Sequence, residues 1–271
     1  MKNNLLRTCF LITLALAAWP GLKPVQAETV LITGSNQGIG LEFARQYAAR
    51  GWTVIATHRR DTTPESLAAL QQQYPNLRVE QMDVTNHDQI EALAAKMKGE
   101  PIDILLNNAA LIRFAQIRDR EGNAGQYFGT LNYDHFDQFM RTNVAGPLKI
   151  AEAFVDNVKA GKLKMMVTIS SGAGMVSVLP RSADHYWYRT SKAALNSAMR
   201  LLTVDLADEG ITVVMFHPGG VQVESWGIDE KLPGTLTPEE AIGRMIKTID
   251  GLTIKDSGRF INNTDGSDMP W

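Results

Sequence analysis

From Glu28 to the end of the chain, short apolar runs rich in β-branched residues alternate with longer stretches of helical periodicity. The runs expected to be strands cover residues 29–33, 53–57, 78–82, 102–106, 164–169, 211–216 and 259–261. The stretches expected to be helices cover residues 39–49, 64–73, 87–98, 136–160, 188–208 and 238–250. Such alternation is typical of a parallel sheet that helices cover on both faces. It predicts an α/β fold of the Rossmann type, a doubly wound parallel sheet of about seven strands, in a single domain over residues 28–271.

Residues 1–27 have the three-part pattern of a secretory signal peptide. Lys2 and Arg7 form a positively charged start, residues 9–19 form an apolar run, and Ala27 ends a small-residue cleavage site. The run is shorter than the ~20 residues that a membrane-spanning helix needs. We therefore expect a cleaved leader and an exported protein, periplasmic or secreted, with no stable membrane insertion afterwards. The alternative is a membrane anchor formed by an uncleaved N-terminus.

The charge and the cysteine content exclude several classes of protein. Lys and Arg number 27 against 29 Asp and Glu, a net charge of -2, so no basic surface points to a nucleic-acid partner. The one cysteine, Cys9, lies in the leader, which excludes a disulfide framework and a cysteine-ligated zinc site. The five histidines have no metal-ligand spacing. We therefore expect neither a metal nor a nucleic acid.

A glycine-rich segment, TGSNQGIG, lies directly between the first expected strand and the first expected helix. Gly34 permits a tight turn, Gly38 lets the backbone approach a pyrophosphate, and Gly40 permits close packing of helix against strand. The alternative is a plain strand-to-helix turn, but the flanking elements stand where phosphate binding requires them. The cofactor-binding residues expected in this segment are Gly34, Ser35, Gln37, Gly38, Ile39 and Gly40.

Further motifs follow this segment in a fixed order. They are Asp83-Val84 after the third strand, Asn107-Asn108-Ala109-Ala110 after the fourth, Asn143 in a helix, Ser171 after the fifth strand, Tyr188 with Lys192 four residues on, and Pro218-Gly219 after the sixth strand. Their order and spacing resemble the short-chain dehydrogenase/reductase family over residues 29–271. The segment YRTSKAALN and the Pro-Trp ending are similar to its carbonyl-reductase-like branch. Val223 departs from the pattern, because relatives usually have a threonine there.

The resemblance implies an NAD(P)-dependent oxidoreductase with Asn143, Ser171, Tyr188 and Lys192 as catalytic residues. Hydride transfer to a carbonyl needs an acid beside the oxygen, and Tyr188 would supply that proton. Lys192, one helical turn away, is expected to stabilise the tyrosinate and to hold the ribose of the cofactor. In the family's mechanism Ser171 binds the substrate oxygen and Asn143 holds a water. Asp83, Val84, Asn108, Pro218 and Gly219 would contact the cofactor.

The choice between NADP and NAD is made at the end of the second strand, where a basic residue pairs with the phosphate of NADP and an acidic one binds the ribose of NAD. The segment reads Thr57-His58-Arg59-Arg60, with no carboxylate before Asp61. This favours NADP, through Arg59 and Arg60, over NAD.

The expected function is transfer of a hydride between NADP(H) and a small aldehyde or ketone, or the corresponding alcohol. A homo-oligomer is consistent with the family, whose members often pair through their fourth and fifth helices. The alternative is a nucleotide-binding sensor or a degenerate relative without turnover, because an exported protein meets little free NADPH. A nucleotide-sugar epimerase or dehydratase is disfavoured, since too few residues follow the sheet to form a substrate domain.

Overall fold

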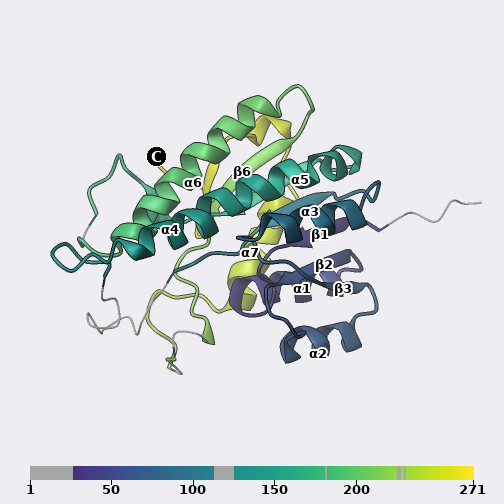
Figure 1. Cartoon of the computed structure of the whole chain (residues 1–271), viewed down its shortest axis with the longest axis horizontal. Coiled ribbons are helices and arrows are strands. Elements are labelled where there is room, and N and C mark those ends of the chain that lie inside the picture. The colour runs from purple at the N-terminus through teal and green to yellow at the C-terminus, as the bar shows by residue number, and fades with distance from the viewer. Residues whose placement is uncertain (1–26, 113–124, 181, 225–226, 229) are drawn as a thin grey trace, which may run out of the picture.

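A parallel sheet of seven strands forms the centre of the molecule, as predicted (Figure 1). The computed structural model describes residues 27–112, 125–180, 182–224, 227–228 and 230–271. The strands are β1 (Thr29–Ile32), β2 (Thr53–His58), β3 (Leu77–Gln81), β4 (Ile104–Asn107), β5 (Met165–Ile169), β6 (Thr212–His217) and β7 (Phe260–Asn262). Their order is β3-β2-β1-β4-β5-β6-β7, and every neighbouring pair is parallel. The chain reverses its direction of winding between β1 and β4.

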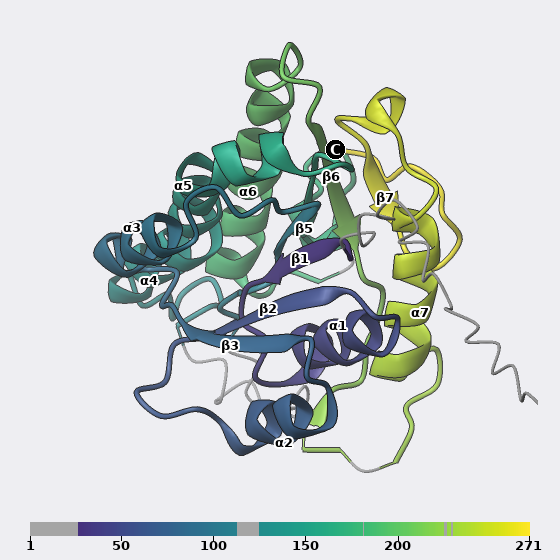
Figure 2. The ribbon, with the colours of Figure 1, turned by 90° about the vertical axis from the view of Figure 1, so that its right-hand side faces the viewer.

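Helices cover both faces of this sheet, which is why the central strands are apolar on both sides. The helices are α1 (Gly38–Ala49), α2 (Glu65–Gln73), α3 (His87–Lys96), α4 (Asp134–Met140), α5 (Gly146–Ala160), α6 (Tyr186–Asp205) and α7 (Pro238–Ile249). One hydrophobic core joins the sheet to α1, α2 and α7, and a second joins it to α3, α5 and α6 (Figure 2). In β1 and β4 every residue is buried, as expected of strands at the middle of a parallel sheet.

The predicted helix over residues 136–160 is not one regular helix. A π-helical turn, η1 (Arg141–Ala145), separates α4 from α5. Pro147 explains the break, because it has no N–H to donate to the carbonyl of Asn143 four residues earlier. The irregular turn therefore falls at Asn143, which it directs into the interior, where the residue is only 1% exposed.

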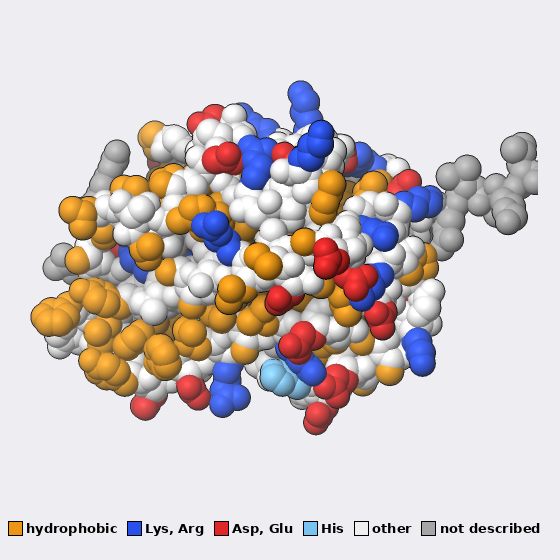
Figure 3. Space-filling model, turned by 90° about the horizontal axis from the view of Figure 1, so that it is seen from above, with side chains coloured by type: hydrophobic (Ala, Val, Ile, Leu, Met, Phe, Trp, Pro, Cys, Tyr) orange, Lys and Arg blue, Asp and Glu red, His pale blue; other side chains and the backbone are white. Residues whose placement is uncertain are grey.

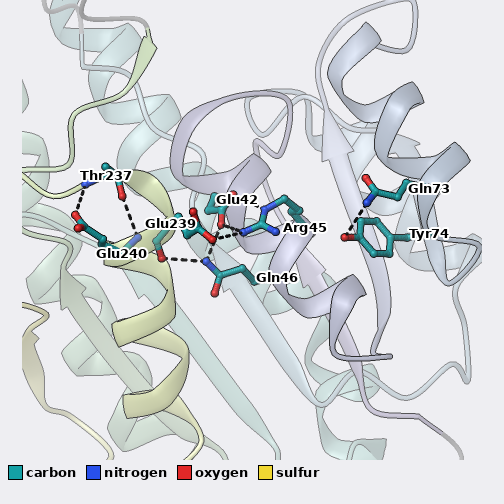
Figure 4. Close-up of polar contacts among 8 residues, drawn as sticks. All are labelled: Glu42, Arg45, Gln46, Gln73, Tyr74, Thr237, Glu239 and Glu240. Atoms are coloured by element: carbon teal, nitrogen blue, oxygen red, sulfur yellow. Dashed lines mark hydrogen bonds and ion pairs between the residues drawn. The ribbon is translucent and has the colours of Figure 1, made fainter. Parts of the chain in front are cut away.

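Helices α1 and α7 lie side by side on their face of the sheet (Figures 2 and 4). Arg45 pairs with Glu42 at 2.6 Å, and Gln46 donates to the main-chain oxygen of Glu239 at 3.1 Å. At the start of α7, Thr237 and Glu240 form a reciprocal capping box. Exposed ion pairs contribute little, about 0–1 kcal/mol each, so the apolar contacts beneath them hold the two helices together.

Hydrophobic side chains gather on the surface at the end of the molecule where α4 and the start of α6 lie (left in Figures 1 and 3). Phe128, Tyr133 and Phe136 are 82%, 72% and 42% exposed. The ring of Phe128 contacts Tyr186, and the rings of Tyr133 and Phe136 contact Trp187, at centroid distances of 5.4–6.5 Å. These contacts fix the segment before α4 against the start of α6.

Residues 1–26 of the predicted leader lie outside the described part of the chain. Within the described part, none of the helices is both long enough and apolar enough to cross a membrane.

Candidate active site

A cavity of about 860 Å³ opens at the carboxyl ends of β1 and β4, where the winding of the sheet reverses. Ligands of open α/β sheets bind at this position, and the volume is within the roughly 300–1,000 Å³ of cofactor sites. Of the predicted site residues, those that line it are Gly34, Gln37, Gly38, Ile39, Gly40, Arg59, Arg60, Asp83, Val84, Asn108, Tyr188, Lys192 and Pro218. The topology thus brings together residues that are up to 184 positions apart, from Gly34 to Pro218.

The glycine-rich segment forms the floor of the cavity and could not be built from larger residues. Gly34 has a φ of +67°, a conformation that L side chains rarely adopt. A Cβ on Gly40 would lie 2.3 Å from the Gly34 oxygen and 2.4 Å from Nδ2 of Asn108. Asn108 braces this turn from below, because its Nδ2 donates to the main-chain oxygens of Thr33 at 2.9 Å and Gly34 at 3.1 Å.

Ser35 and Gly219 are not among the residues that line the cavity, so their expected contacts with a cofactor stay predictions. The Ser35 side chain is fully buried and its hydroxyl donates to the main-chain oxygen of Ile32 at 2.8 Å, so it holds the turn rather than facing a ligand. Gly219 lies against Thr264 with a φ of +83° and gives the chain its turn after β6. Both residues shape turns that lie next to the cavity.

The far end of the cavity is lined by His58, Arg59 and Arg60 from the end of β2. Both arginines are exposed, whereas His58 is buried, and burial lowers its pKa while a hydrogen bond with the Arg60 backbone opposes that change. Asp61, the next carboxylate in sequence, does not line the cavity. Asp83 does line it, with one oxygen accepting from the main-chain N–H and the hydroxyl of Thr85 at 2.9 Å and 2.8 Å.

Tyr188 lines the other end of the cavity, together with Ser170, and contacts Ser171 beside it; Ser171 and Asn143 are not among the lining residues. The Ser171 hydroxyl hydrogen-bonds the Tyr188 phenol, whereas the hydroxyl of the neighbouring Ser170 donates to Asn196 at 2.5 Å. This geometry distinguishes the second serine of the pair from the first. Burial raises the pKa of Tyr188, which is 7% exposed, and the Ser171 hydrogen bond opposes that rise. The phenol is therefore protonated at neutral pH.

Lys192 lies one helical turn beyond Tyr188, with its Nζ 5.8 Å from the centre of the Tyr188 ring. Nζ donates to the main-chain oxygen of Ile169 at 2.9 Å, and the residue is 2% exposed. Burial lowers the pKa of Lys192 to about 7. Burial thus shifts both residues toward their neutral forms in the protein alone, and the expected stabilisation of the tyrosinate by Lys192 stays a prediction for the enzyme with its cofactor bound.

The side chain of Asn143 is committed to protein partners. Its Nδ2 donates to the Leu111 oxygen and to Oγ of Ser191, both at 2.9 Å, and its Oδ1 accepts from the Leu111 N–H at 2.7 Å. Both amide hydrogens are used, so a water held by this side chain would have to bind through Oδ1. Asn143 also ties the segment after β4 to the helix that carries Tyr188.

Two contacts that the sequence analysis did not anticipate shape the site. Gln126 holds the start of α6: its main-chain oxygen accepts from the Tyr186 N–H at 3.1 Å and its Oε1 from the Tyr188 N–H at 3.2 Å. No sequence signal links residues 62 positions apart in this way. Val223 lines the cavity and lies over the glycine-rich segment, 3.2 Å from the position of a Cβ on Gly38.

The comparisons with known proteins identify the family. The family model of short chain dehydrogenases matches residues 28–230. The chain belongs to the short-chain dehydrogenase/reductase family. This short-chain dehydrogenase is 31% identical over 249 residues to a 1-hydroxy-2-glutathionyl-2-methyl-3-butene dehydrogenase of Rhodococcus sp. (strain AD45), covering 90% of this chain and 100% of the relative.

Solved structures agree with the sequence match. The NADPH-bound carbonyl reductase from chicken fatty liver superposes with a TM-score of 0.80 at 29% identity, covering 91% of this chain and 100% of that one. A Burkholderia multivorans short-chain dehydrogenase/reductase with bound NADP gives a TM-score of 0.75 at 29% identity, covering 90% and 100%. The short-chain dehydrogenase described here is thus an oxidoreductase of the carbonyl-reductase type that uses a nicotinamide cofactor.

Metal ions have no evident place in this site. Among the residues that the structure describes, no group of three or more His, Cys, Asp or Glu side chains is arranged to hold a metal ion. The arrangement offers a buried phenol, hydrogen-bonded by Ser171, and a buried amine at one end of a dinucleotide-sized cavity, with guanidinium groups at the other.

Proposed function

We propose that this enzyme is an NADP-dependent reductase of small aldehydes and ketones, able to run in reverse on the alcohols. The observation that carries the proposal is the Tyr188 phenol, buried, protonated and hydrogen-bonded by Ser171 at the wall of the cavity. A protonated phenol held by a second hydroxyl is the acid that a developing alkoxide requires. Of the relatives named above, the chicken protein is a carbonyl reductase and the Rhodococcus protein is a dehydrogenase of a hydroxy compound, as their names state.

The residues present fit a nicotinamide dinucleotide. Gly34, Gly38 and Gly40 leave backbone space that any Cβ would fill, and α1 begins at Gly38 with its N-terminus at the cavity. Free N–H groups and the dipole of a helix N-terminus favour phosphate. In our proposal this loop holds the pyrophosphate, Asp83 and Val84 hold the adenosine, and Lys192 holds the ribose next to the nicotinamide.

The preference for NADP rests on Arg59 and Arg60. Both line the cavity from the end of β2, and the nearest carboxylate in sequence, Asp61, does not. Guanidinium groups bind phosphate through charge-assisted hydrogen bonds, whereas a carboxylate is needed to bind the two ribose hydroxyls of NAD. The chicken and Burkholderia structures contain NADPH and NADP.

The chemistry of reduction divides between the cofactor and this chain. A bound nicotinamide supplies the hydride. Ser171 donates a hydrogen bond to the substrate carbonyl, and Tyr188 transfers its proton to that oxygen as the negative charge develops. Lys192 then restores the charge balance beside the tyrosinate, and its pKa of about 7 suits proton exchange at neutral pH. Asn143 holds α6 against the segment after β4 through its hydrogen bonds to Ser191 and Leu111.

The experiment is an assay of NADPH consumption by the purified protein with a panel of small aldehydes and ketones, repeated with NADH. We expect turnover with NADPH on at least one carbonyl, and a higher kcat/KM with NADPH than with NADH. Binding of nucleotide without turnover on any carbonyl would favour the alternative, a nucleotide-binding sensor. Absence of nucleotide binding would contradict the proposal as a whole.

We further propose that residues 1–27 are a leader that is removed on export. The support is the charge and apolar pattern of Lys2, Arg7 and residues 9–19. Mass spectrometry of the protein expressed in full length, with cell fractionation, tests this. A mature N-terminus at Glu28 in an extracytoplasmic fraction is expected, whereas an intact membrane-bound chain would show an anchor.

We also propose that the enzyme forms a homo-oligomer through the outer faces of α5 and α6. In support, Leu201 and Val204, three positions apart on α6, are 66% and 74% exposed and offer apolar surface to a second copy. Light scattering of the wild type and of Leu201→Glu tests this. A wild-type monomer at assay concentration would contradict it.

A further inference from the structure

The turn that carries Ser171 is held in place from two sides. It continues into η2 (Gly172–Gly174), whose Gly174 packs on α6 so closely that a Cβ there would lie 2.7 Å from the main-chain carbon of Lys192. On the opposite side the turn faces the end of β6 and the C-terminal tail, because a Cβ on Gly172 would approach Met269 and His217. The position of Ser171 relative to α6 therefore depends on both neighbours.

Most N–H groups of this turn find acceptors within the turn itself. The Ala173 N–H donates to Oγ of Ser171 at 3.1 Å, and the Gly174 N–H donates to the Ser171 main-chain oxygen at 2.9 Å. The Gly172 N–H instead reaches a residue 45 positions later, Nδ1 of His217, at 3.1 Å. This bond holds the peptide group that directly follows Ser171.

His217 is well placed to serve as a fixed acceptor. It is the last residue of β6, its register partner is Asn262 of β7, and its main-chain oxygen accepts from the Asn263 N–H at 2.9 Å. Because Nδ1 accepts, the neutral ring carries its hydrogen on Nε2. Burial lowers the pKa of His217, which keeps the ring neutral and Nδ1 free of a proton at neutral pH.

We propose that His217 is a positioning residue of the reaction, which aims the Ser171 hydroxyl by accepting the Gly172 N–H. The inference rests on the proposed function, in which Ser171 binds the substrate oxygen. Without this acceptor the Gly172 N–H loses its hydrogen bond, and the peptide after Ser171 loses its link to the end of β6, while the bonds within the turn remain. We expect the turn to shift as a unit and to move Oγ of Ser171 away from the Tyr188 phenol.

The test compares substitutions that keep or lose an acceptor at the position of Nδ1. His217→Asn keeps an acceptor, because Oδ1 of asparagine is bonded to Cγ as Nδ1 of histidine is. His217→Gln moves the amide one bond farther from the main chain, and His217→Leu removes the acceptor. We expect kcat close to wild type for Asn, and a loss on the order of tenfold to a hundredfold for Gln and Leu, as for other displacements of about 1 Å in an active site. The KM for NADPH should be unchanged in all three.

A double-mutant cycle separates positioning from general destabilisation. In a Ser171→Ala background, His217→Gln should cause no further loss of kcat, because the group that His217 aims is already gone. Wild-type kcat in the Gln and Leu variants would overturn the inference. So would an equal loss in the Asn variant, or a full additional loss in the Ser171→Ala background. If the His217→Leu variant does not fold, the His217→Gln variant still tests the inference.

The tautomer of His217 can be measured without any enzyme turnover, so this test is separate from the test of the proposed function. The ¹⁵N NMR spectrum of the imidazole of His217 at pH 7 should show the neutral tautomer with its hydrogen on Nε2. A hydrogen on Nδ1 would overturn the inference even in an active enzyme. Conversely, absence of wild-type turnover on every carbonyl, with the expected tautomer present, would count against the proposed function and leave the His217–Gly172 contact confirmed.

Discussion

Nζ of Lys192 lies 5.8 Å from the centre of the Tyr188 ring and donates to the main-chain oxygen of Ile169 at 2.9 Å. Both side chains are buried, so both are shifted toward their neutral forms before a cofactor arrives. The protein alone therefore presents a proton-bearing phenol and an amine that loses its proton far more readily than an ordinary lysine. Negative phosphates at the site would favour the charged amine, so the cofactor helps to set the state of the residues that act on the substrate.

The first prediction concerns Lys192 and stability. Its folded pKa of about 7 lies below the unfolded value of about 10.4, so between these values the unfolded chain binds more protons. The free energy of unfolding should then rise with pH across this window, and the buried charge should destabilise the fold most below pH 7. Lys192→Met should be more stable than wild type at about pH 6, with the difference shrinking toward about pH 10.

Thermal unfolding across that pH range measures the effect. Lys247→Met, which alters an exposed lysine of α7, is the matched control and should shift Tm little at any pH. A Tm difference for Lys192→Met that does not change with pH would show that the amine is not titrating as described.

The second prediction concerns the close packing at Gly40. An alanine Cβ would lie 2.3 Å from the Gly34 oxygen, a main-chain atom that can move only by opening the turn. Gly40→Ala should lower the free energy of unfolding by about 1–3 kcal/mol and weaken nucleotide binding. Gly243→Ala in α7, where the nearest atom is 3.7 Å away, should be neutral or stabilising by about 0.5–1 kcal/mol. Denaturant melts of both variants measure the change in the free energy of unfolding. An equal change in the two variants would contradict the steric argument.

The third prediction concerns Arg59 and the choice of nucleotide. Loss of a charge-assisted hydrogen bond costs about 1.5–3 kcal/mol, so Arg59→Ala should weaken NADPH binding by roughly 10- to 100-fold while NADH binding stays the same. Fluorescence titration with each nucleotide measures this. Arg244→Ala, an exposed arginine of α7 outside the cavity, is the control. Equal weakening of both nucleotides would remove Arg59 from phosphate recognition.

The sequence predicted the sheet, the helices and most of the cavity wall because these depend on local patterns. Buried β-branched runs mark parallel strands, and Gly34 to Gly40 mark the turn that approaches a ligand. The π-helical turn at Asn143 was missed although Pro147 signals it, because a helical periodicity of side chains continues through the break. The burial of Ser35 and the engagement of Asn143 by Leu111 and Ser191 depend on tertiary packing and have no local signature.

The contacts between distant segments also could not be predicted from the sequence. Gln126 meets Tyr188, and His217 meets Gly172, only because the fold brings a loop and a strand end to the same helix and turn. The lowered pKa of Lys192 in the protein alone also could not be predicted from the sequence. A spacing of four residues predicts that two side chains are neighbours, but the degree of burial decides which protonation state each one favours.

The most direct test of the central claim is steady-state and binding analysis of Tyr188→Phe with NADPH and a carbonyl that the wild type reduces. The variant keeps the ring and loses only the acidic hydroxyl, and Tyr133→Phe, on a residue that is 72% exposed, is the matched control. The account predicts that kcat falls by about 10²- to 10⁴-fold while the Kd for NADPH stays within about twofold of wild type. A Tyr188→Phe enzyme with near wild-type kcat would contradict it.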